Sequence, residues 1–464
     1  MSIDAVPTTS PFLSGLLAPV GDERDDHELE IVGELPDGLR GMFVRNGPNP
    51  QFAPLGKYHP FDGDGMLHAV SFDEGGASYR NRWIESKGLL AERRRGAAQF
   101  GGLGELVMPD AEVQAEVGFL KNTANTHTIR HGGRLLALLE AAPPTEFSQT
   151  LETLGEWDFA GRLVGGMTAH PKVDPVSGEM HFFGYAPFPP YLRYHVADAA
   201  GTLVHSTEIE LPNPVMIHDF VLTQHHVVFL DAPAIFDVVN AMSGGPIMRW
   251  DESQGTRLGV LPRRGDGADI RWFELDTCYV VHFFNAWETD GHIEIRAPRF
   301  PTMPGGFDFE HPGGHTVPMP WRWSLDLAAG TIVGEQTDDR SGEFPRINDN
   351  FASLPTRYLY NCQPRTWEFE FEFNGVVKYD LETGTSQQRS YAESEVSGEH
   401  VFVPDPGGVA EDDGWLLTMV ADRARDASDL VVLDAHDIEA EPVARIRIPR
   451  RVPLGFHANW FPAV

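Results

Sequence analysis

Short runs of apolar residues recur through most of the 464-residue chain, separated by glycine, proline and charged residues. Typical runs are 135–139, 226–230 and 430–433. The 47 glycines and 36 prolines make turns frequent, and long helical periodicities are scarce. Short runs between turn residues are typical of strands joined in hairpins. The pattern therefore predicts an all-β protein, and by itself it leaves a sandwich, a barrel and a propeller open.

No repeat of fixed length and signature accompanies these runs, which argues against a WD40 or kelch array. A propeller can nevertheless be built from divergent blades. Its central axis brings together residues from distant parts of a chain. Functional residues that are widely spaced in the sequence would fit that architecture well.

Four histidines stand among apolar or aromatic neighbours, where an imidazole is costly unless its nitrogens are satisfied. They are His170 in Gly166–Pro171, His218 in Val215–Phe220, His282 in Tyr279–Phe284 and His457 in Leu454–Trp460. A single histidine of this kind is more often a hydrogen-bonded core residue, and these four lie too far apart to form a short-range metal motif. The residues alone leave both interpretations open, four core histidines or four ligands of one metal.

The charge balance limits the partners. With 68 acidic against 36 basic residues the formal net charge is −32, which argues against nucleic acid and against electrostatic binding to anionic membranes. The two cysteines, Cys278 and Cys362, cannot form a disulfide framework and predict a reducing cytoplasm. We find no basic leader with an apolar run behind it, no stretch of membrane-spanning length and no coiled-coil signal. We therefore expect a cytoplasmic monomer.

From about Pro36 to the last residues the chain resembles the carotenoid cleavage oxygenase family, which includes carotenoid and apocarotenoid dioxygenases, lignostilbene dioxygenases and the retinoid isomerohydrolase. The resemblance rests on the blocks Pro36–Gly41, Met42–Pro50, Phe61–His68 and Asn285–Glu288 and on the four histidine segments, in the family's order. It implies one domain over residues 1–464, with 1–35 as an N-terminal extension. The implied fold is an all-β, seven-bladed β-propeller whose loops and few helices cap a metal on the axis.

The resemblance also implies a site. Non-haem Fe(II), one per chain, would be held by His170, His218, His282 and His457. Carboxylates would receive the second N–H of three of these rings, pairing Glu140 with His218, Glu343 with His282 and Glu399 with His457 and leaving His170 without one. Thr126 is a candidate for the side chain near the open iron positions, and a simple turn threonine is the equal alternative.

Four neutral imidazoles leave two positions of an octahedral ion free, which suits a redox metal that meets dioxygen beside a substrate. Zinc has no redox chemistry, and catalytic zinc usually keeps three protein ligands. The activity that the resemblance implies is cleavage of a C=C bond by O2, which gives two carbonyl products.

The substrate is an apolar alkene, and the residue before Glu140 bears on which one. Family members that cleave stilbenoids and alkenyl-phenols tend to have a lysine there, with a tyrosine, to hold the phenol oxygen. Here the position is Leu139, and no tyrosine occurs between Tyr79 and Tyr185. A carotenoid or apocarotenoid is therefore favoured. A stilbenoid or alkenyl-phenol of the lignostilbene, isoeugenol or vinylguaiacol type remains the alternative, with Lys121 or Tyr358 reading the phenol.

Three further expectations concern other classes of function. The metal could serve as a Lewis acid in a propeller hydrolase or lactonase. A propeller could also be a non-catalytic platform for other proteins. The apolar segment 232–250 is either plain core or, as the resemblance implies, a cap region with shallow membrane contact.

Overall fold

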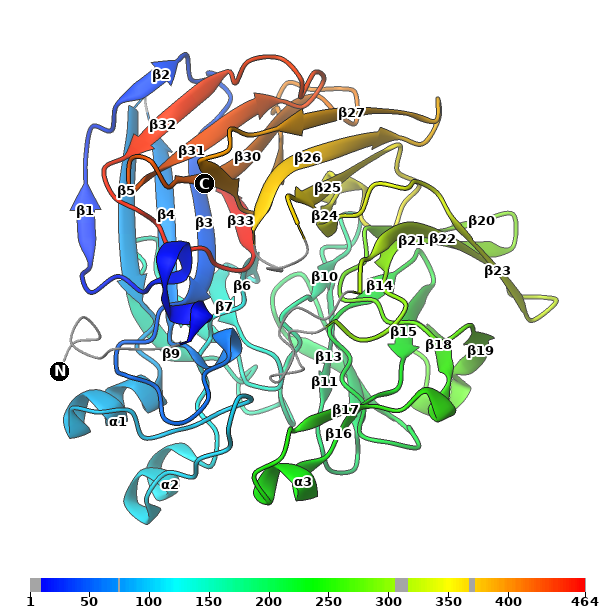
Figure 1. The fold of residues 1–464 in the computed structure, drawn as a ribbon. Helices are drawn as coiled ribbons and strands as arrows, with labels where there is room; N and C mark the ends of the chain where they lie inside the picture. Colours follow the sequence, from blue (N-terminus) through cyan, green and yellow to red (C-terminus); the bar gives the residue numbers. More distant parts are fainter. Residues whose placement is uncertain (1–9, 74–75, 305–315, 367–371, 464) are drawn as a thin grey trace.

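Strands dominate the protein in the computed structural model, which describes residues 10–73, 76–304, 316–366 and 372–463 (Figure 1). All pairings between the described strands are antiparallel, as hairpin connections require. The helices among these residues are short. The prediction of a mostly β protein is thus confirmed.

Four sheets have four strands each and follow one another along the chain. The first is β6 (His127–His131), β7 (Arg134–Leu138), β8 (Thr145–Phe147) and β9 (Thr153–Glu156). The second is β10 (Lys172–Val173), β11 (Met180–Tyr185), β12 (Leu192–Ala197) and β13 (Leu203–Ile209). The third is β14 (Phe220–Leu222), β15 (His226–Asp231), β18 (Thr256–Pro262) and β19 (Arg271–Leu275). The fourth is β20 (Asn285–Thr289), β21 (His292–Arg299), β22 (Met319–Asp326) and β23 (Thr331–Gln336).

The strands that follow, together with β2 near the N-terminus, form one sheet of ten strands. In the middle of this sheet, β28 pairs with β26 on one side and with β30 on the other. Its members are β2 (Ile31–Gly33), β24 (Glu343–Arg346), β25 (Tyr358–Pro364), β26 (Phe373–Asp380), β27 (Thr385–Ser390), β28 (Glu395–Ser397), β29 (Val401–Pro404), β30 (Gly414–Asp422), β31 (Ala427–Asp434) and β32 (Ala444–Ile448). In Figure 1 the sheets succeed one another around the molecule, with blue and red strands side by side at the upper left.

The last sheet joins the two ends of the described chain. Its order is β1 (Arg24–Asp26), β5 (Gly76–Trp83), β4 (Gly65–Asp73), β3 (Gly41–Pro48) and β33 (Ala458–Pro462). β33 pairs with β3 in the register Arg45↔Ala458. Two strands of the segment expected to be an extension also join sheets, because β1 pairs with β5 and β2 with β32.

Alternation of buried and more exposed side chains explains why these segments are strands. β5 alternates strictly between half-exposed and buried positions along its whole length. Inner strands such as β11 are buried on both faces and read as continuous apolar runs. The largest apolar cluster lies between the second, third and fourth sheets and includes Phe183, Phe229 and Ile295.

Three short helices and a two-stranded hairpin lie together at the bottom of Figure 1 and form a cap. They are α1 (Lys87–Arg95), α2 (Ala111–Val117), α3 (Val238–Met242), β16 (Ala234–Phe236) and β17 (Met248–Trp250). The Ser86 hydroxyl caps α1 by accepting from the Leu89 N–H, and Gly96, at φ 71°, ends it. Asp110 caps α2 in the same way.

The segment 232–250, for which core and cap were both open, contains β16, α3 and β17. Val239 and Met242 on α3 are 77% and 76% exposed. Phe236, Ile247 and Met248 instead line a cavity described below. The segment is therefore part of the cap. No helix in the described part of the chain is long and apolar enough to cross a membrane.

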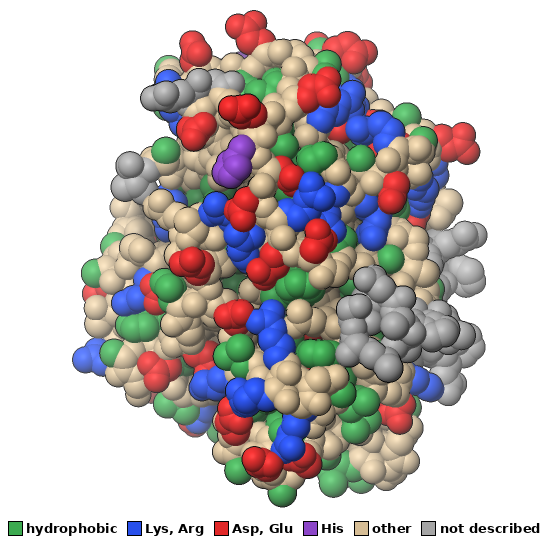
Figure 2. Space-filling view, turned by 90° about the vertical axis from the view of Figure 1, so that its left-hand side faces the viewer, with side chains coloured by type: hydrophobic (Ala, Val, Ile, Leu, Met, Phe, Trp, Pro, Cys, Tyr) green, Lys and Arg blue, Asp and Glu red, His purple; other side chains and the backbone are tan. Residues whose placement is uncertain are grey.

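The surface and the cysteines are as the composition suggests. Figure 2 shows acidic and basic side chains intermixed over one face, so the excess of acid does not gather in a single region there. Cys278 and Cys362 are both buried and free.

Candidate metal centre

The four predicted histidines lie at equivalent places in the fold. Each comes one to three residues before a strand at the edge of its sheet: His170 before β10, His218 before β14, His282 before β20 and His457 before β33. All four are buried. Since four different sheets contribute one residue each, the histidines meet only when these sheets are assembled around a common centre.

The structure brings the four imidazoles together through their Nε2 atoms. The Nε2 of His218 is 3.0 Å from the Nε2 of His170 and 3.0 Å from that of His282, and the Nε2 of His457 is 3.1 Å from that of His282. All four ligand atoms lie within 4.8 Å of one another. They form the only group of three or more His, Cys, Asp or Glu found in the described residues that could hold a metal ion.

Three carboxylates stand behind the rings. Glu140 forms a close ion pair with His218 Nδ1, Glu343 Oε2 is 2.6 Å from His282 Nδ1, and Glu399 Oε1 is 3.1 Å from His457 Nδ1. These are the pairs that the family resemblance implies. His170 has no carboxylate partner among the residues described. A carboxylate on Nδ1 accepts that N–H, so the Nε2 lone pair of each paired ring faces the centre.

The electrostatics favour neutral rings. Burial lowers the pKa of His170, His282 and His457, and the neighbouring rings lower it further, to about 3 for His282. At His218 the pKa is raised, because Glu140 outweighs the effect of burial. A metal binds the neutral form of imidazole, so three of the four rings are already in the binding form at neutral pH.

The donor set fits a divalent transition metal. Converging Nε2 lone pairs repel one another unless a cation lies between them. Two nitrogens that are each about 2.1 Å from one ion are about 3.0 Å apart at a right angle and about 3.4 Å apart in a tetrahedron. The observed 3.0–3.1 Å separations match the right angle. The site can therefore hold a metal in a geometry that leaves coordination positions open.

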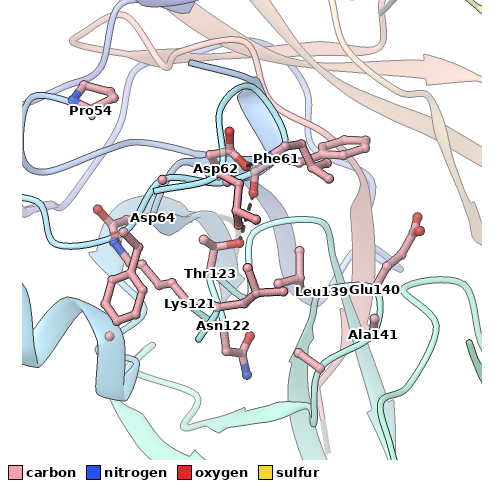
Figure 3. A pocket seen from close by; sticks show the side chains of 18 of the residues that line it. Pro54, Phe61, Asp62, Asp64, Lys121, Asn122, Thr123, Leu139, Glu140 and Ala141 are labelled. Carbon is pink, nitrogen blue, oxygen red and sulfur yellow. Dashed lines mark hydrogen bonds and ion pairs between the residues drawn. The ribbon is translucent and has the colours of Figure 1, made fainter. Parts of the chain in front are cut away.

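A cavity of about 510 Å³, the larger cavity, lies beside this centre and is lined there by Thr126, Glu140 and Phe61, while the four histidines are not among its lining residues. Phe61 stacks on His218 with ring centroids 6.5 Å apart. Thr126 is buried, and its backbone O accepts from the N–H of His457. Figure 3 looks into this cavity, with Leu139 and Glu140 on the side away from Asp64 and Lys121. Most of its lining is apolar, including Phe52, Phe100, Leu103, Leu120, Leu139, Met216, Phe236 and Ile247.

A second cavity of about 340 Å³, the smaller cavity, touches the centre through His170, His282 and His457. Its lining includes charged side chains next to the histidines: Lys172 pairs with Asp219 at 2.7 Å, and Arg346 lies 3.7 Å from Glu399. Histidines of the centre thus line the smaller cavity, whereas the larger cavity borders the residues that contact His218 and His457.

Several residues of the site were not predicted. His127 lies beside His170 and His457, with ring centroids 5.8 and 5.4 Å apart. Its Nδ1 is 3.0 Å from the carbonyl O of Ala169, and burial lowers its pKa to about 3. The Tyr185 hydroxyl donates to Glu140. Only the position of His127 could have pointed to it in the sequence, because it directly follows the predicted site residue Thr126.

The two residues considered as phenol readers are placed differently. Lys121 is buried and lines the larger cavity. Tyr358 lies on β25, where the Lys378 ammonium is 4.2 Å from its ring centroid, and it is not among the described residues that line either cavity. Of these two residues, only Lys121 can therefore contact a ligand in the larger cavity.

Comparison with known proteins places the chain among related enzymes. The family model described as retinal pigment epithelial membrane protein matches residues 17–462. Carotenoid 9,10(9′,10′)-cleavage dioxygenase 1 of Phaseolus vulgaris is 34% identical over 96% of this chain and 88% of its own length. Isoeugenol monooxygenase of Pseudomonas nitroreducens is also 34% identical, over 97% of this chain and 98% of its own.

Solved structures agree. The crystal structure of Pseudomonas brassicacearum lignostilbene dioxygenase superimposes with a TM-score of 0.92 at 32% identity and covers 99% of this chain and 100% of that one. The cobalt-substituted Synechocystis apocarotenoid oxygenase gives a TM-score of 0.86 at 28% identity, covering 96% of this chain and 97% of that one.

Proposed function

The chain belongs to the carotenoid cleavage oxygenase family and is an oxygenase of that type, and from this premise we propose that it is a non-haem Fe(II) dioxygenase that cleaves a C=C bond of a carotenoid or apocarotenoid. One O2 adds across the double bond, and its two oxygen atoms end in two carbonyl products. One observation carries the choice of substrate: the larger cavity, which lies beside the histidine centre at Phe61 and Glu140, is mainly apolar and has Leu139 beside Glu140.

The residues have distinct tasks in this proposal. His170, His218, His282 and His457 would hold the iron, which supplies the redox chemistry that activates O2. Glu140, Glu343 and Glu399 keep three Nδ1–H groups pointed away from it and so hold the rings in the binding tautomer. Thr126 would lie next to the open coordination positions of the metal, and its place in the wall of the larger cavity supports this role.

The larger cavity would bind and orient the substrate. An extended polyene is bound by removal of its apolar surface from water, at about 25 cal/mol per Å². Phe61, stacked on His218, and Leu139 would hold the double bond near the centre and exclude water from it. No side-chain proton donor is needed, because neither product requires a proton from the protein.

A second substrate class is supported by Lys121, a polar side chain in the larger cavity, and by the likeness to a lignostilbene dioxygenase. The protein would then cleave a stilbenoid or alkenyl-phenol and release an aromatic aldehyde. We place this second because the position before Glu140 is leucine.

The proposal also covers architecture and setting. β24–β27 and β29–β32 each form a run of four consecutive antiparallel strands within the ten-stranded sheet. Counted separately and added to the other five main sheets, they give a seven-bladed propeller in one domain. We further propose a cytoplasmic monomer that does not bind nucleic acid and that touches membrane only through the exposed part of 232–250.

The test is oxygen uptake by the iron-loaded protein, with β-apo-8′-carotenal and, separately, 4-hydroxystilbene, and with products identified by mass. Cleavage of the polyene with one O2 consumed per bond supports the first proposal, and cleavage of the stilbene alone supports the second. A protein that consumes no oxygen with any alkene of either class, or that hydrolyses esters or lactones equally well with calcium, contradicts both.

A further inference from the structure

A buried charged cluster interrupts the apolar lining of the larger cavity. The Lys121 ammonium forms a close ion pair with Asp64 and lies 2.5 Å from Glu92 Oε2. The three side chains are only 8%, 3% and 3% exposed, yet all of them line the cavity. Figure 3 shows Lys121 and Asp64 on one side of the cavity and Glu140, the partner of His218, on the other.

The cluster has hydrogen-bonding capacity left over. An ammonium carries three N–H donors, and the described residues provide two acceptors for them, on Asp64 and Glu92. The backbone N–H of Gln51 donates to Asp64 and that of Gln99 to Glu92, which holds both carboxylates in place. Although burial opposes it, these carboxylates raise the pKa of Lys121, so the group is charged at neutral pH.

Stability does not account for such a cluster. Apolar residues of similar volume often stabilise a protein as well as or better than a buried ion pair does. Most residues that line the cavity are apolar, so packed apolar side chains would also suit this position. Two carboxylates against one ammonium also leave a net negative charge beside the cavity, which repels anions and attracts a hydrogen-bond donor.

We infer that Lys121, with Asp64 and Glu92, binds the hydroxyl-bearing end of a neutral substrate whose double bond lies at the histidine centre. A hydroxyl oxygen accepts the third Lys121 N–H, and the hydroxyl proton is donated to a carboxylate. If the end of the substrate is a hydrocarbon, one N–H of the Lys121 ammonium stays without an acceptor in a site that excludes water. If the end is a carboxylate, the net negative charge of the cluster repels it. The inference rests on the proposed function and sharpens it, because a ring alcohol of a polyene and a phenol share this chemistry.

The experiment uses two pairs of compounds that differ by one hydroxyl, 3-hydroxy-β-apo-8′-carotenal with β-apo-8′-carotenal and 4-hydroxystilbene with stilbene. For the full-length protein we expect kcat/KM and Kd to favour the hydroxyl compound of at least one pair by about 10- to 100-fold, the range for a hydrogen bond to a charged group. The pair that shows the preference identifies the source of the hydroxyl. 4-Carboxystilbene is expected not to bind.

The variant Lys121→Met should reduce that preference to about 1, in both kcat/KM and Kd. Lys121→Met leaves the buried carboxylates of Asp64 and Glu92 without a cation. The double variant Lys121→Met with Glu92→Gln is therefore made as well, because it removes one of these two charges. Lys87→Met is the matched control, since Lys87 also lines the cavity but is 62% exposed and pairs with Glu156. It should keep the preference.

The inference is overturned if neither pair shows a preference, or if the preference survives in the double variant. Failure of the proposed function looks different, because then no compound is cleaved by the iron-loaded protein. The dissociation constants of the two pairs, measured by calorimetry without turnover, still decide the role of Lys121 in that case.

Discussion

The two cavities lie beside the same four-histidine centre and differ in what they could admit. The larger one approaches past Thr126, Phe61 and Glu140 and is mainly apolar. The smaller one touches three of the imidazoles directly and contains the Lys172–Asp219 pair. An alkene is bound by apolar contact and therefore belongs in the first, whereas water and ions are better accommodated in the second. One metal site can thus lie between an apolar cavity and a more polar one. The substrate is then selected by the residues of the larger cavity alone.

The largest effect should come from the histidine centre that both cavities approach. His218→Ala removes one of four nitrogen donors, so we expect metal content to fall well below one per chain and oxygen uptake to fall by more than about a thousandfold. Metal analysis and an oxygen electrode measure this, with circular dichroism to check the fold. His195→Gln changes a buried histidine outside the centre and should keep full metal content. An unchanged metal content in His218→Ala would make the four histidines structural and the protein a binding platform.

The next effect tests which cavity selects the substrate. Leu139→Lys places an ammonium in the apolar wall, so kcat/KM for the polyene should fall by about 10- to 100-fold while 4-hydroxystilbene gains. Val173→Lys makes the same change in the smaller cavity and should leave the ratio of the two substrates unaltered. Equal effects of the two variants would remove the distinction between the cavities.

A smaller effect separates the carboxylates. Glu140 lines the larger cavity and Glu399 the smaller, and each supports one imidazole. Glu140→Gln and Glu399→Gln should each weaken metal binding by about 10- to 100-fold, as measured by competition with a chelator. Only Glu140→Gln should also raise KM for the alkene, because it disturbs the Tyr185 hydroxyl in the same wall. A KM that rises in both variants would contradict the assignment.

The smallest effect is a pH dependence located at the larger cavity. Burial raises the pKa of Asp62 from 3.8 to about 6 in the folded protein. Between those values the folded state keeps a proton that the unfolded state has lost, so stability falls as the pH rises and levels off above about pH 6. Asp62→Asn lacks this dependence. The melting temperature of the wild type, relative to the variant, should drop by about 1 to 2 degrees from pH 5 to 7.5, and a rise would refute the assignment.

The sequence was informative where function imposes local patterns. The histidine segments and the acids Glu140, Glu343 and Glu399 could be identified because each lies in a short block typical of the family. Contacts between distant loops leave no such pattern. Phe61, in a block noted only for the resemblance, stacks on His218, and Lys121 pairs with Asp64 and Glu92. Such pairs depend on how sheets and cap loops meet in space, which periodicity along one strand does not encode.

The N-terminal segment shows the same limit. Residues 1–35 were expected to be an extension, and their apolar alternation is too weak to predict strands. β1 and β2 nevertheless pair with β5 and β32, because the edges of those sheets offer unpaired backbone groups that any extended segment can satisfy.

The pairing of β33 with β3 has a consequence for biosynthesis. β3 is synthesised long before β33, and its edge stays without that partner until β33 has followed it from the ribosome. His457 arrives with the same strand, so the fourth nitrogen donor appears in the event that joins the two ends. The complete set of four nitrogen donors therefore exists only once β33 has paired with β3.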